Sequence, residues 1–464
     1  MRRVLFVAVL FLATVSAHAQ IQLLAIGSLT SSSAGSNADL SGLTNILENG
    51  APANLLGGFG SGITWAGGNT FLAVPDRGPN AVGWASSLDD TASYIERFHT
   101  IQMDLEPNSG AGLPFTLTPT LEKTTLFFSA SPLVYGAGGE LDNQGNVIGS
   151  AVPAQNGPSR NYFTGRSDNF DPNRNSGNTE DARLDSEGIR VSNDGLFVYT
   201  SDEYGPYLNE YLRANGQRIR SFRLPDSFYV DNLSPVGAVE ISGNSSGRVA
   251  NKGMEGLAIT PDGQTLVGIV QNALIQDAKL GGAAANLLRI VTIDRNSGRV
   301  THQYAYLLTT GTGVSEIAAL NNHEFLVDER DGKGRASQNN AQVKQLFKID
   351  LAGAVDVSDM DGLQAATNAV AKSPMPFLDI VSILTANGVS AGLIPAKIEG
   401  VSLGPDVNWN GNIVHTLWVA NDNDFLIQTT DSKGNTIDNP NQFFVFGFSD
   451  TDLGGSQLLL QQFK

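Results

Sequence analysis

The clearest pattern along the chain is a pair of short hydrophobic stretches joined by a turn. The first begins in residues 184–189, which read Leu-Asp-Ser-Glu-Gly-Ile, and the second lies in residues 197–205, which read Phe-Val-Tyr-Thr-Ser-Asp-Glu-Tyr-Gly. Residues 192–195 between them read Ser-Asn-Asp-Gly, and an Asp-Gly pair between two β-rich stretches favours a tight hairpin turn. The pattern therefore predicts two antiparallel strands.

The outer ends of this hairpin are acidic. In an antiparallel pair, the start of the first strand and the end of the second lie at the same edge of the sheet. We therefore expect four carboxylates to meet there, namely those of Asp185, Glu187, Asp202 and Glu203. Carboxylates that gather need a cation, a shared proton or open water to relieve their repulsion. This edge is the first candidate site.

The same order of polar entry, strand, turn, strand and polar exit recurs along the chain. Two strong copies lie in residues 254–272 and 397–424, and two weaker ones in residues 60–78 and 315–330. Long repeats of this kind are typical of propeller blades or of a solenoid. The alternative is that Glu-Gly and Asp-Gly pairs only punctuate an all-β protein rich in turns. We predict an all-β fold, a β-propeller of five to six four-stranded blades, with the repeats as inner strands.

The remaining segments complete or interrupt these blades. Residues 21–27 form a strand that we expect to close the ring in the last blade, although residues 458–460 compete for that place. Residues 129–182 read as a loop insertion, and a sixth blade would have to lie within residues 106–182. Residues 360–396 read as a helical insertion, because apolar side chains recur there at helical spacing.

Composition adds the compartment and excludes several kinds of chemistry. The chain begins with Met-Arg-Arg, an apolar run over residues 4–15 and an Ala-His-Ala sequence, which is typical of a signal peptide cleaved after Ala19. We therefore expect residues 20–464 to form a single periplasmic or secreted domain. The run is too short to span a bilayer, and no later apolar segment is long enough, so we expect no integral membrane segment.

Net charge and cysteine content exclude several binding partners and several kinds of site. The formal net charge of −17 argues against nucleic acid and anionic membranes as partners. The absence of cysteine excludes disulfides, thiol nucleophiles and thiolate metal sites. Carboxylates and backbone carbonyls suit Ca²⁺, and Mg²⁺ less well. The oligomeric state stays open, with a monomer favoured.

The polar ends of the repeats supply the candidate site, because the inner strands of a propeller line one channel and their ends converge at its mouth. The predicted metal ligands are Asp76, Asp185, Glu187, Asp202, Glu203, Glu316, Asp328 and Asp422. The cations at the same ends are predicted to hold a small anionic substrate or ligand, and these are Arg77, Lys252, Arg330 and Lys397. The alternative is that the cations and carboxylates only pair with one another and cap the channel.

Four of these segments resemble a known family. Residues 185–188, 201–205, 253–257 and 397–400 are similar to the acidic motifs of the phytase-like domain, also called "esterase-like activity of phytase". The resemblance covers roughly residues 55 to 450 and implies an exported β-propeller with a role in phosphoester hydrolysis. The candidate catalytic residues are Glu187, Asp202, Glu255 and Glu399. The third copy departs from the pattern, because Gln271 and Asn272 replace its acidic exit.

Three functions remain open at this point. The first is a metal-dependent hydrolase of phosphoesters, and the second is a propeller that binds calcium and a ligand without turnover. The third is a calcium-dependent lactonase-like or esterase-like propeller. A serine hydrolase is disfavoured, because none of the three Gly-x-Ser-x-Gly matches lies on a clear strand-to-helix turn.

Overall fold

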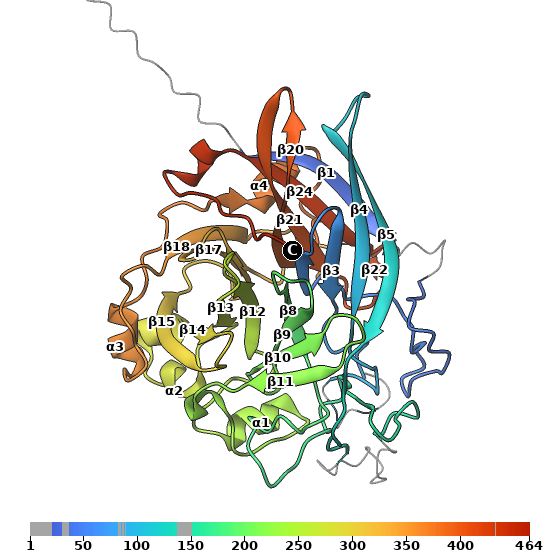
Figure 1. The fold of residues 1–464 in the computed structure, drawn as a ribbon, viewed down its shortest axis with the longest axis vertical. Helices are drawn as coiled ribbons and strands as arrows, with labels where there is room; N and C mark the ends of the chain where they lie inside the picture. The colour runs from blue at the N-terminus through green and yellow to red at the C-terminus, as the bar shows by residue number, and fades with distance from the viewer. Residues whose placement is uncertain are drawn as a thin grey trace, which may run out of the picture.

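Five four-stranded antiparallel sheets surround a central axis in the computed structural model of the chain (Figure 1). The structure describes residues 21–29, 37–81, 85, 88, 90–136, 151–431 and 433–464. The predicted signal peptide lies outside these residues. The inner strand of each sheet contacts the inner strands of both neighbouring sheets, so the ring is closed. The fold is therefore a five-bladed β-propeller.

Each blade is built from one repeat and the strands that follow it. Blade 1 contains β2 (Gly62–Trp65), β3 (Thr70–Val74), β4 (Arg97–Pro107) and β5 (Phe115–Leu126). Blade 2 contains β8 (Ser186–Val191), β9 (Phe197–Asp202), β10 (Leu208–Leu212) and β11 (Arg218–Phe222). Blade 3 contains β12 (Met254–Ile259), β13 (Thr265–Val270), β14 (Leu287–Asp294) and β15 (Val300–Leu307).

Blade 4 contains β16 (Gly313–Ala319), β17 (Glu324–Arg330), β18 (Lys344–Asp350) and the short β19 (Leu378–Asp379). Blade 5 contains β20 (Lys397–Trp409), β21 (Asn412–Asp422), β24 (Asn441–Phe448) and, as its outer strand, β1 (Gln22–Leu29). The ring is thus closed by the N-terminal strand, as predicted. All five repeats supply inner strands, which confirms the repeat pattern.

The short elements outside the blades lie in their connections. They include two strand pairs, β6 (Phe128–Ser129) with β7 (Asn161–Tyr162) and β22 (Gln428–Thr430) with β23 (Thr436–Asp438). The α-helices are α1 (Gly237–Gly243), α2 (Ile275–Ala278), α3 (Gly362–Thr367) and α4 (Ile380–Ala386). Three short 3-10 helices are η1 (Asp226–Phe228), η2 (Gly282–Asn286) and η3 (Asp450–Leu453), the last of which follows blade 5. The described part of residues 106–182 holds no sixth blade, because β4 and β5 belong to blade 1. The predicted helical insertion contains α3 and α4, but it also supplies the edge strand β19.

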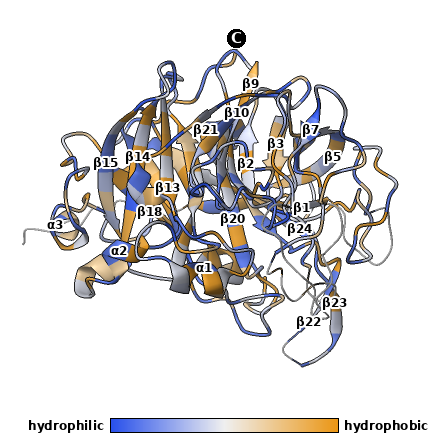
Figure 2. Ribbon diagram, turned by 90° about the horizontal axis from the view of Figure 1, so that it is seen from below, coloured by the Kyte–Doolittle hydropathy of each residue, from blue (hydrophilic) through white to orange (hydrophobic). Residues whose placement is uncertain are grey.

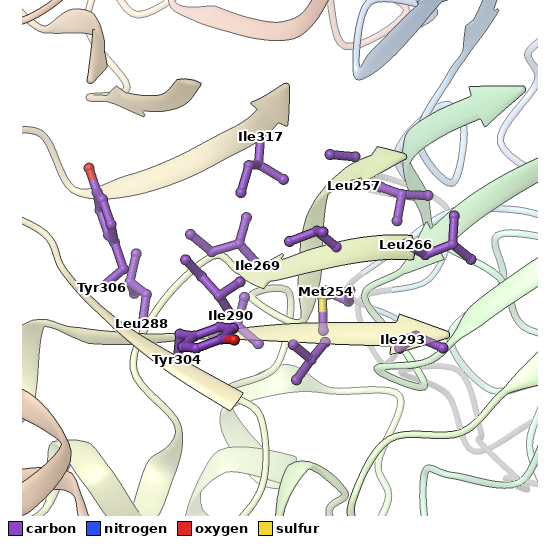
Figure 3. Packing of buried hydrophobic residues seen from close by; sticks show 14 of the residues in the cluster. Met254, Leu257, Leu266, Ile269, Leu288, Ile290, Ile293, Tyr304, Tyr306 and Ile317 are labelled. Carbon is purple, nitrogen blue, oxygen red and sulfur yellow. The ribbon is translucent and has the colours of Figure 1, made fainter. Parts of the chain in front are cut away.

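The core lies between neighbouring blades. Figure 3 shows Leu257, Ile269 and Ile290 of blade 3 packed in one cluster with Ile317 of blade 4. All four side chains are fully buried. In Figure 2, hydrophobic and hydrophilic residues alternate along strands of the blades, as expected for sheets that pack face to face. Burial of apolar side chains therefore holds the ring together in a chain without cysteine.

The C-terminal residues do not form the strand that we considered for residues 458–460. They instead cross one end of the channel, and Figure 1 shows the C-terminus over the centre of the ring. The Leu459 amide donates to the Leu320 carbonyl of blade 4 over 2.8 Å, and the Gln461 side chain donates to the Val191 carbonyl of blade 2 over 2.6 Å. The ring of Phe463 packs edge-on against Trp65 of blade 1. The tail thus ties three blades together.

We expect removal of residues 457–464 to lower the free energy of unfolding by about 2 kcal/mol, the scale of burying one or two apolar side chains. Urea denaturation of the truncated and full-length chains measures the difference. Gln462→Ala serves as a control, because this exposed side chain donates only to the Leu460 carbonyl. Equal stability of the truncated and full-length chains would show that the tail ties nothing together.

Candidate functional site

A cavity of about 200 Å³ lies at the opposite end of the ring from the tail. The tail contacts the turns of the inner hairpins, whereas this cavity is formed where inner strands start and their partner strands end. Most of the predicted site residues line it: Asp76, Arg77, Glu187, Glu203, Lys252, Glu255, Arg330, Lys397 and Glu399. The propeller therefore brings together residues that are more than 300 positions apart in the sequence.

Bulges at the starts of the inner strands explain how glutamates come to face the cavity. The pairing of β8 with β9 shifts register between Ser186 and Ile189, and β12 and β20 shift at the equivalent points. A bulge leaves one residue unpaired and re-aims its side chain. In these three blades the residues in the bulge include Glu187, Glu255 and Glu399.

The glycine that follows each of these glutamates has a packing role. A Cβ added at Gly188 would lie 2.6 Å from the Leu257 Cβ of the next inner strand, and one at Gly256 would lie 2.8 Å from the Ile317 nitrogen. Both distances are too short for real contacts. Glycine therefore lets neighbouring inner strands approach closely, and the repeated Glu-Gly pair combines a site residue with a packing requirement.

One group of three carboxylates has the geometry of a cation site. Oxygens of Asp185, Glu187 and Glu203 lie within 4.8 Å of one another, and all three residues are buried. The only cation in direct contact with this group among the described residues is Arg77, whose Nη1 lies 2.6 Å from Asp185 Oδ2. A buried set of carboxylate oxygens is the donor set that a hard cation such as Ca²⁺ takes. The residues present therefore fit a divalent cation.

The carboxyl groups of this site repel one another strongly. Burial, together with the Glu255 and Asp185 carboxylates, raises the pKa of both Glu187 and Glu203 well above the ordinary value. Burial and the nearby Glu399 carboxylate raise the pKa of Glu255 to about 7. In the absence of a cation, these groups therefore hold protons near neutral pH.

A second group of three carboxylates already contains a cation of the chain itself. Oxygens of Asp76, Asp422 and Asp424 lie within 4.8 Å of one another. Lys397 Nζ lies 2.6 Å from Asp422 Oδ2 and 2.5 Å from Asp424 Oδ1. Burial raises the pKa of Asp76 to about 7 although Lys397 acts to lower it. Because the ammonium occupies this group, the group of Asp185, Glu187 and Glu203 is the better candidate for a metal.

The other two cations of the cavity are held differently. Arg330 Nη2 forms an ion pair with Glu399. Lys252 Nζ donates to Gln271 Oε1 over 2.8 Å, and the Gln271 amide donates in turn to Glu255 over 2.7 Å. The replacement of an acidic exit by Gln271 thus gives an amide that connects Lys252 to Glu255. No carboxylate of the described residues is within ion-pair distance of the Lys252 ammonium.

Four predicted residues lie buried beneath the cavity rather than on its surface: Asp185, Asp202, Asp328 and Asp422. Burial raises the pKa of both Asp202 and Asp328 to about 8. Asp202 Oδ1 accepts from the Asp185 and Tyr204 amides, so it fixes the backbone between two site segments. Asp202 was predicted to be catalytic, but it does not reach the surface of the cavity. Any part that it has in catalysis would therefore be to position other residues.

Glu316 lies inside the channel, away from the group of Asp185, Glu187 and Glu203. The sequence predicted a metal ligand at this position, but Ser315 occupies the bulge of blade 4 and Glu316 pairs opposite Asp328. Its carboxylate lies 3.0 Å from Arg190 Nη2. The Arg190 guanidinium also donates to carbonyls of four inner strands, those of Ile63, Ile189, Ile317 and Val401. This ion pair fills the channel between the cavity and the tail.

Some residues at the site were not found by sequence reasoning. Glu96 is fully buried, neither of its oxygens has a hydrogen-bond partner among the described residues, and nearby Asp185 and Asp76 contribute to its strongly raised pKa. It follows the hydrophobic Ile95 and lies immediately before β4, so no local pattern marks it. Asn251 lines the cavity from the connection before β12, and its left-handed backbone, with φ of 55°, is also invisible in the sequence.

Comparison with known proteins agrees with the motifs. The phytase-like family, described as "Esterase-like activity of phytase", matches residues 54–425. A relative from Arthroderma benhamiae, described as an uncharacterized secreted protein, is 26% identical over 452 residues and aligns with 86% of this chain and 83% of its own length. Within the described part of the chain, no helix is long and apolar enough to cross a membrane.

Solved structures with similar folds are more distant. The periplasmic gluconolactonase of Pseudomonas aeruginosa is 12% identical, with a TM-score of 0.34, and the alignment covers 92% of this chain and 99% of that one. The aldose sugar dehydrogenase of Streptomyces coelicolor is also 12% identical, with a TM-score of 0.32, and the alignment covers 89% and 83%. Neither alignment carries information about the site.

Proposed function

Because the chain belongs to the phytase-like family, we propose that it is an exported, metal-dependent hydrolase of phosphoesters. The observation that supports this proposal most is one cavity lined by four cations and by Glu187 and Glu203, with Asp185, the third carboxylate of the buried group, beneath it. Carboxylates would hold a hard cation, with Ca²⁺ favoured over Mg²⁺. The cations beside them would hold phosphate oxygens. Export is supported by the sequence of the first 19 residues and by the secreted relative.

The charge of the cavity indicates the order of binding. Its lining includes five carboxyl groups, those of Asp76, Glu187, Glu203, Glu255 and Glu399, against the cations Arg77, Lys252, Arg330 and Lys397. With all groups ionised, five against four leaves one negative charge, and buried Asp185 adds another. At a pH where these carboxyl groups are ionised, a free phosphoester would be repelled by this charge, whereas a divalent cation reverses its sign. We therefore expect anion binding to require the metal once these groups are ionised.

The residues of the chain would then have distinct tasks. Asp185, Glu187 and Glu203 would hold the metal, which polarises phosphoryl oxygens and activates water when bound. Lys252 is free of a carboxylate partner among the described residues and would bind a phosphate oxygen. Arg330 is fixed in place by Glu399. Glu255, with a pKa near 7, would donate a proton to the departing alcohol at neutral pH.

A binding protein without turnover is the second candidate. It is favoured by the ion pairs that Arg77, Arg330 and Lys397 already make with carboxylates. Lys252 is therefore the cation that can bind an anion without first breaking an ion pair with a carboxylate. The two candidates share the metal and the anion, and they differ only in whether a bond is broken.

The test combines stability with activity. Calcium should raise the melting temperature, because a ligand bound only by the folded state stabilises it by mass action. The protein is then assayed against phosphomonoesters, phosphodiesters and carboxylic esters, with calcium, with magnesium and with chelator. Calcium-dependent release of phosphate supports the hydrolase. Calcium-dependent stabilisation without any turnover supports the binding protein, and no response to calcium leaves the carboxylates as ion-pair partners alone.

We expect calcium affinity to increase between pH 6 and pH 8. Burial and the neighbouring carboxylates raise the pKa values of Glu187 and Glu203 well above the ordinary value, so calcium must displace protons from these two ligands at lower pH. Calorimetry in buffers of different ionisation enthalpy measures both the affinity and the protons released. A calcium affinity that is constant over this range would instead indicate binding at ordinary surface carboxylates, whose pKa values are about 4.

A further inference from the structure

A second cavity adjoins the first at the side of the ring mouth. It has a volume of about 400 Å³ and lies beside α1, the helix in the connection between blades 2 and 3. Arg77 and Asn251 line both cavities. A ligand bound in the first cavity can therefore extend past these two residues into the second.

The lining of the second cavity differs from that of the first. Pro235, Ala238 and Ile241 give it an apolar side. Its own charged groups are Arg183 and Arg248 against the carboxylates of Asp90 and Glu240, and Arg77, which also lines the first cavity, adds a third cation. With an apolar side and arginines in its wall, the second cavity is suited to an organic group with an anionic substituent.

Arg183 is the group best placed to recognise that substituent. It is 2% exposed, and its Nη2 has no hydrogen-bond partner among the described residues. Its nearest carboxylate oxygen is that of Glu240 at 3.9 Å, which is beyond hydrogen-bond distance. Its Nη1 donates to the Ser167 carbonyl over 3.4 Å, and the guanidinium lies over the Phe170 and Tyr204 rings, 4.7 Å and 5.2 Å from the ring centres. A buried donor without a partner costs free energy, and an anionic ligand would satisfy it.

Asn251, at the junction, has an unusual backbone. Its φ of 55° lies in the left-handed region, which few residues other than glycine adopt and which Asn tolerates better than most. Asn251 lies in a tight turn, which the Lys252 amide closes by donating to the Val249 carbonyl over 3.1 Å. This turn places Asn251 at the junction between the cavities.

We propose that the second cavity binds the organic group of the substrate, carrying an anionic substituent, while the reactive phosphoester lies in the first cavity. This inference rests on the proposed function and adds a substrate class, the phosphoesters of bulky, acidic alcohols. Arg77 would lie between the two parts of the ligand. The apolar face beside α1 would contact the carbon skeleton, and Arg183 would bind the second anionic group.

The test uses phosphonates, which bind like phosphates but are not hydrolysed. Binding of methylphosphonate, benzylphosphonate and 4-carboxybenzylphosphonate to the calcium-loaded protein is measured by calorimetry. We expect at least a tenfold increase in affinity from methylphosphonate to the carboxybenzyl compound, with benzylphosphonate between them. Equal affinities for all three compounds would overturn this inference and leave the proposed function intact.

Substitutions in the second cavity test whether the gain in affinity for the larger phosphonates arises there. Ala238→Trp, at an exposed position of α1, should fill the cavity, abolish the preference for the larger compounds and leave methylphosphonate binding unchanged. Ala238→Ser is the matched control and should behave like the wild type. Retention of the full preference by Ala238→Trp would overturn the inference.

Arg183→Met separates the two parts of the proposed recognition. It should remove only the gain due to the carboxyl group and keep that due to the benzyl ring. Because Arg183 is buried, the melting curve of the Arg183→Met variant is measured first. If this variant does not fold, the comparison of Ala238→Trp with Ala238→Ser decides whether the second cavity binds the organic group. If the calcium-loaded wild type binds none of the phosphonates, the proposed function fails and this inference fails with it.

Discussion

The Glu187→Gln variant is expected to lose most of its calcium response and any calcium-dependent hydrolysis. Glutamine keeps the size and shape of the side chain but removes one of the three anionic ligands of the proposed metal site. Loss of one hard ligand, with its charge, should weaken calcium binding by roughly tenfold to a hundredfold. Melting curves at increasing calcium concentrations, for the variant and the wild type, measure this loss.

The same substitution should have the opposite effect on stability when calcium is absent. The pKa of Glu187 is raised in the folded protein, so its contribution to stability is complete at low pH and is lost as the pH rises through the folded pKa. Glutamine does not ionise, so the variant does not lose stability at this position as the pH rises. The calcium-free variant should therefore be more stable than the calcium-free wild type at pH 8, and the difference should shrink at pH 5.

Glu316→Gln provides a buried control for this experiment. Glu316 faces Arg190 in the channel and does not belong to the group of Asp185, Glu187 and Glu203. Its substitution should leave the calcium response intact, because Glu316 contributes no oxygen to that group. If Glu187→Gln responded to calcium and hydrolysed phosphoesters as the wild type does, Glu187 would not be a ligand of the metal.

The sequence was informative about the blades because the same physical requirement recurs in each of them. An inner strand needs apolar residues along its length, a tight turn and, where neighbouring strands converge, a glycine such as Gly188 or Gly256. These requirements leave a local pattern that can be counted. The closing role of β1 was also predictable, since an N-terminal strand without a partner has only a ring edge to join.

The detailed geometry of the site was less predictable, because it depends on register and on distant partners. Blades 3 and 4 have the same bulge, but Ser315 stands where blade 3 has Glu255, and Glu316 stands where it has Gly256, so the Glu316 side chain lies inside the channel. Arg190 looked like an ordinary strand residue, although it binds carbonyls of four inner strands. Contacts between residues far apart in the chain leave no local signal.

The choice between cation sites illustrates the same point. The sequence placed Asp76 and Asp422 beside Lys397 but could not say whether the lysine would face a substrate or its own carboxylates. The structure places its ammonium between Asp422 and Asp424. Lys397 is therefore first a structural counter-ion, and its proposed contact with a substrate is secondary.

The Lys397→Met variant is accordingly expected to be destabilised. Removing Lys397 leaves buried Asp422 without its counter-ion, but the Lys397 side chain is 30% exposed, so the cost lies between those of a surface and a buried ion pair, at about 1–3 kcal/mol in the free energy of unfolding. Lys397 acts to lower the pKa of both Asp76 and Asp422, so those pKa values should rise further without it. An acid whose pKa is raised by folding destabilises the folded state above that pKa, so the loss should be largest at pH 8 and smaller at pH 5.

Lys252→Met is the contrasting substitution, and the pair separates support of the fold from ligand binding. Lys252 contacts only the neutral Gln271 side chain among the described residues, so its loss should change stability by no more than about 0.5 kcal/mol. It should nevertheless weaken phosphonate binding to the calcium-loaded protein. Urea denaturation at both pH values, with calorimetry for the ligand, tests both variants. If Lys397→Met were as stable as the wild type, the group of Asp76, Asp422 and Asp424 would need no lysine as its counter-ion. That group would then become the stronger candidate for the metal.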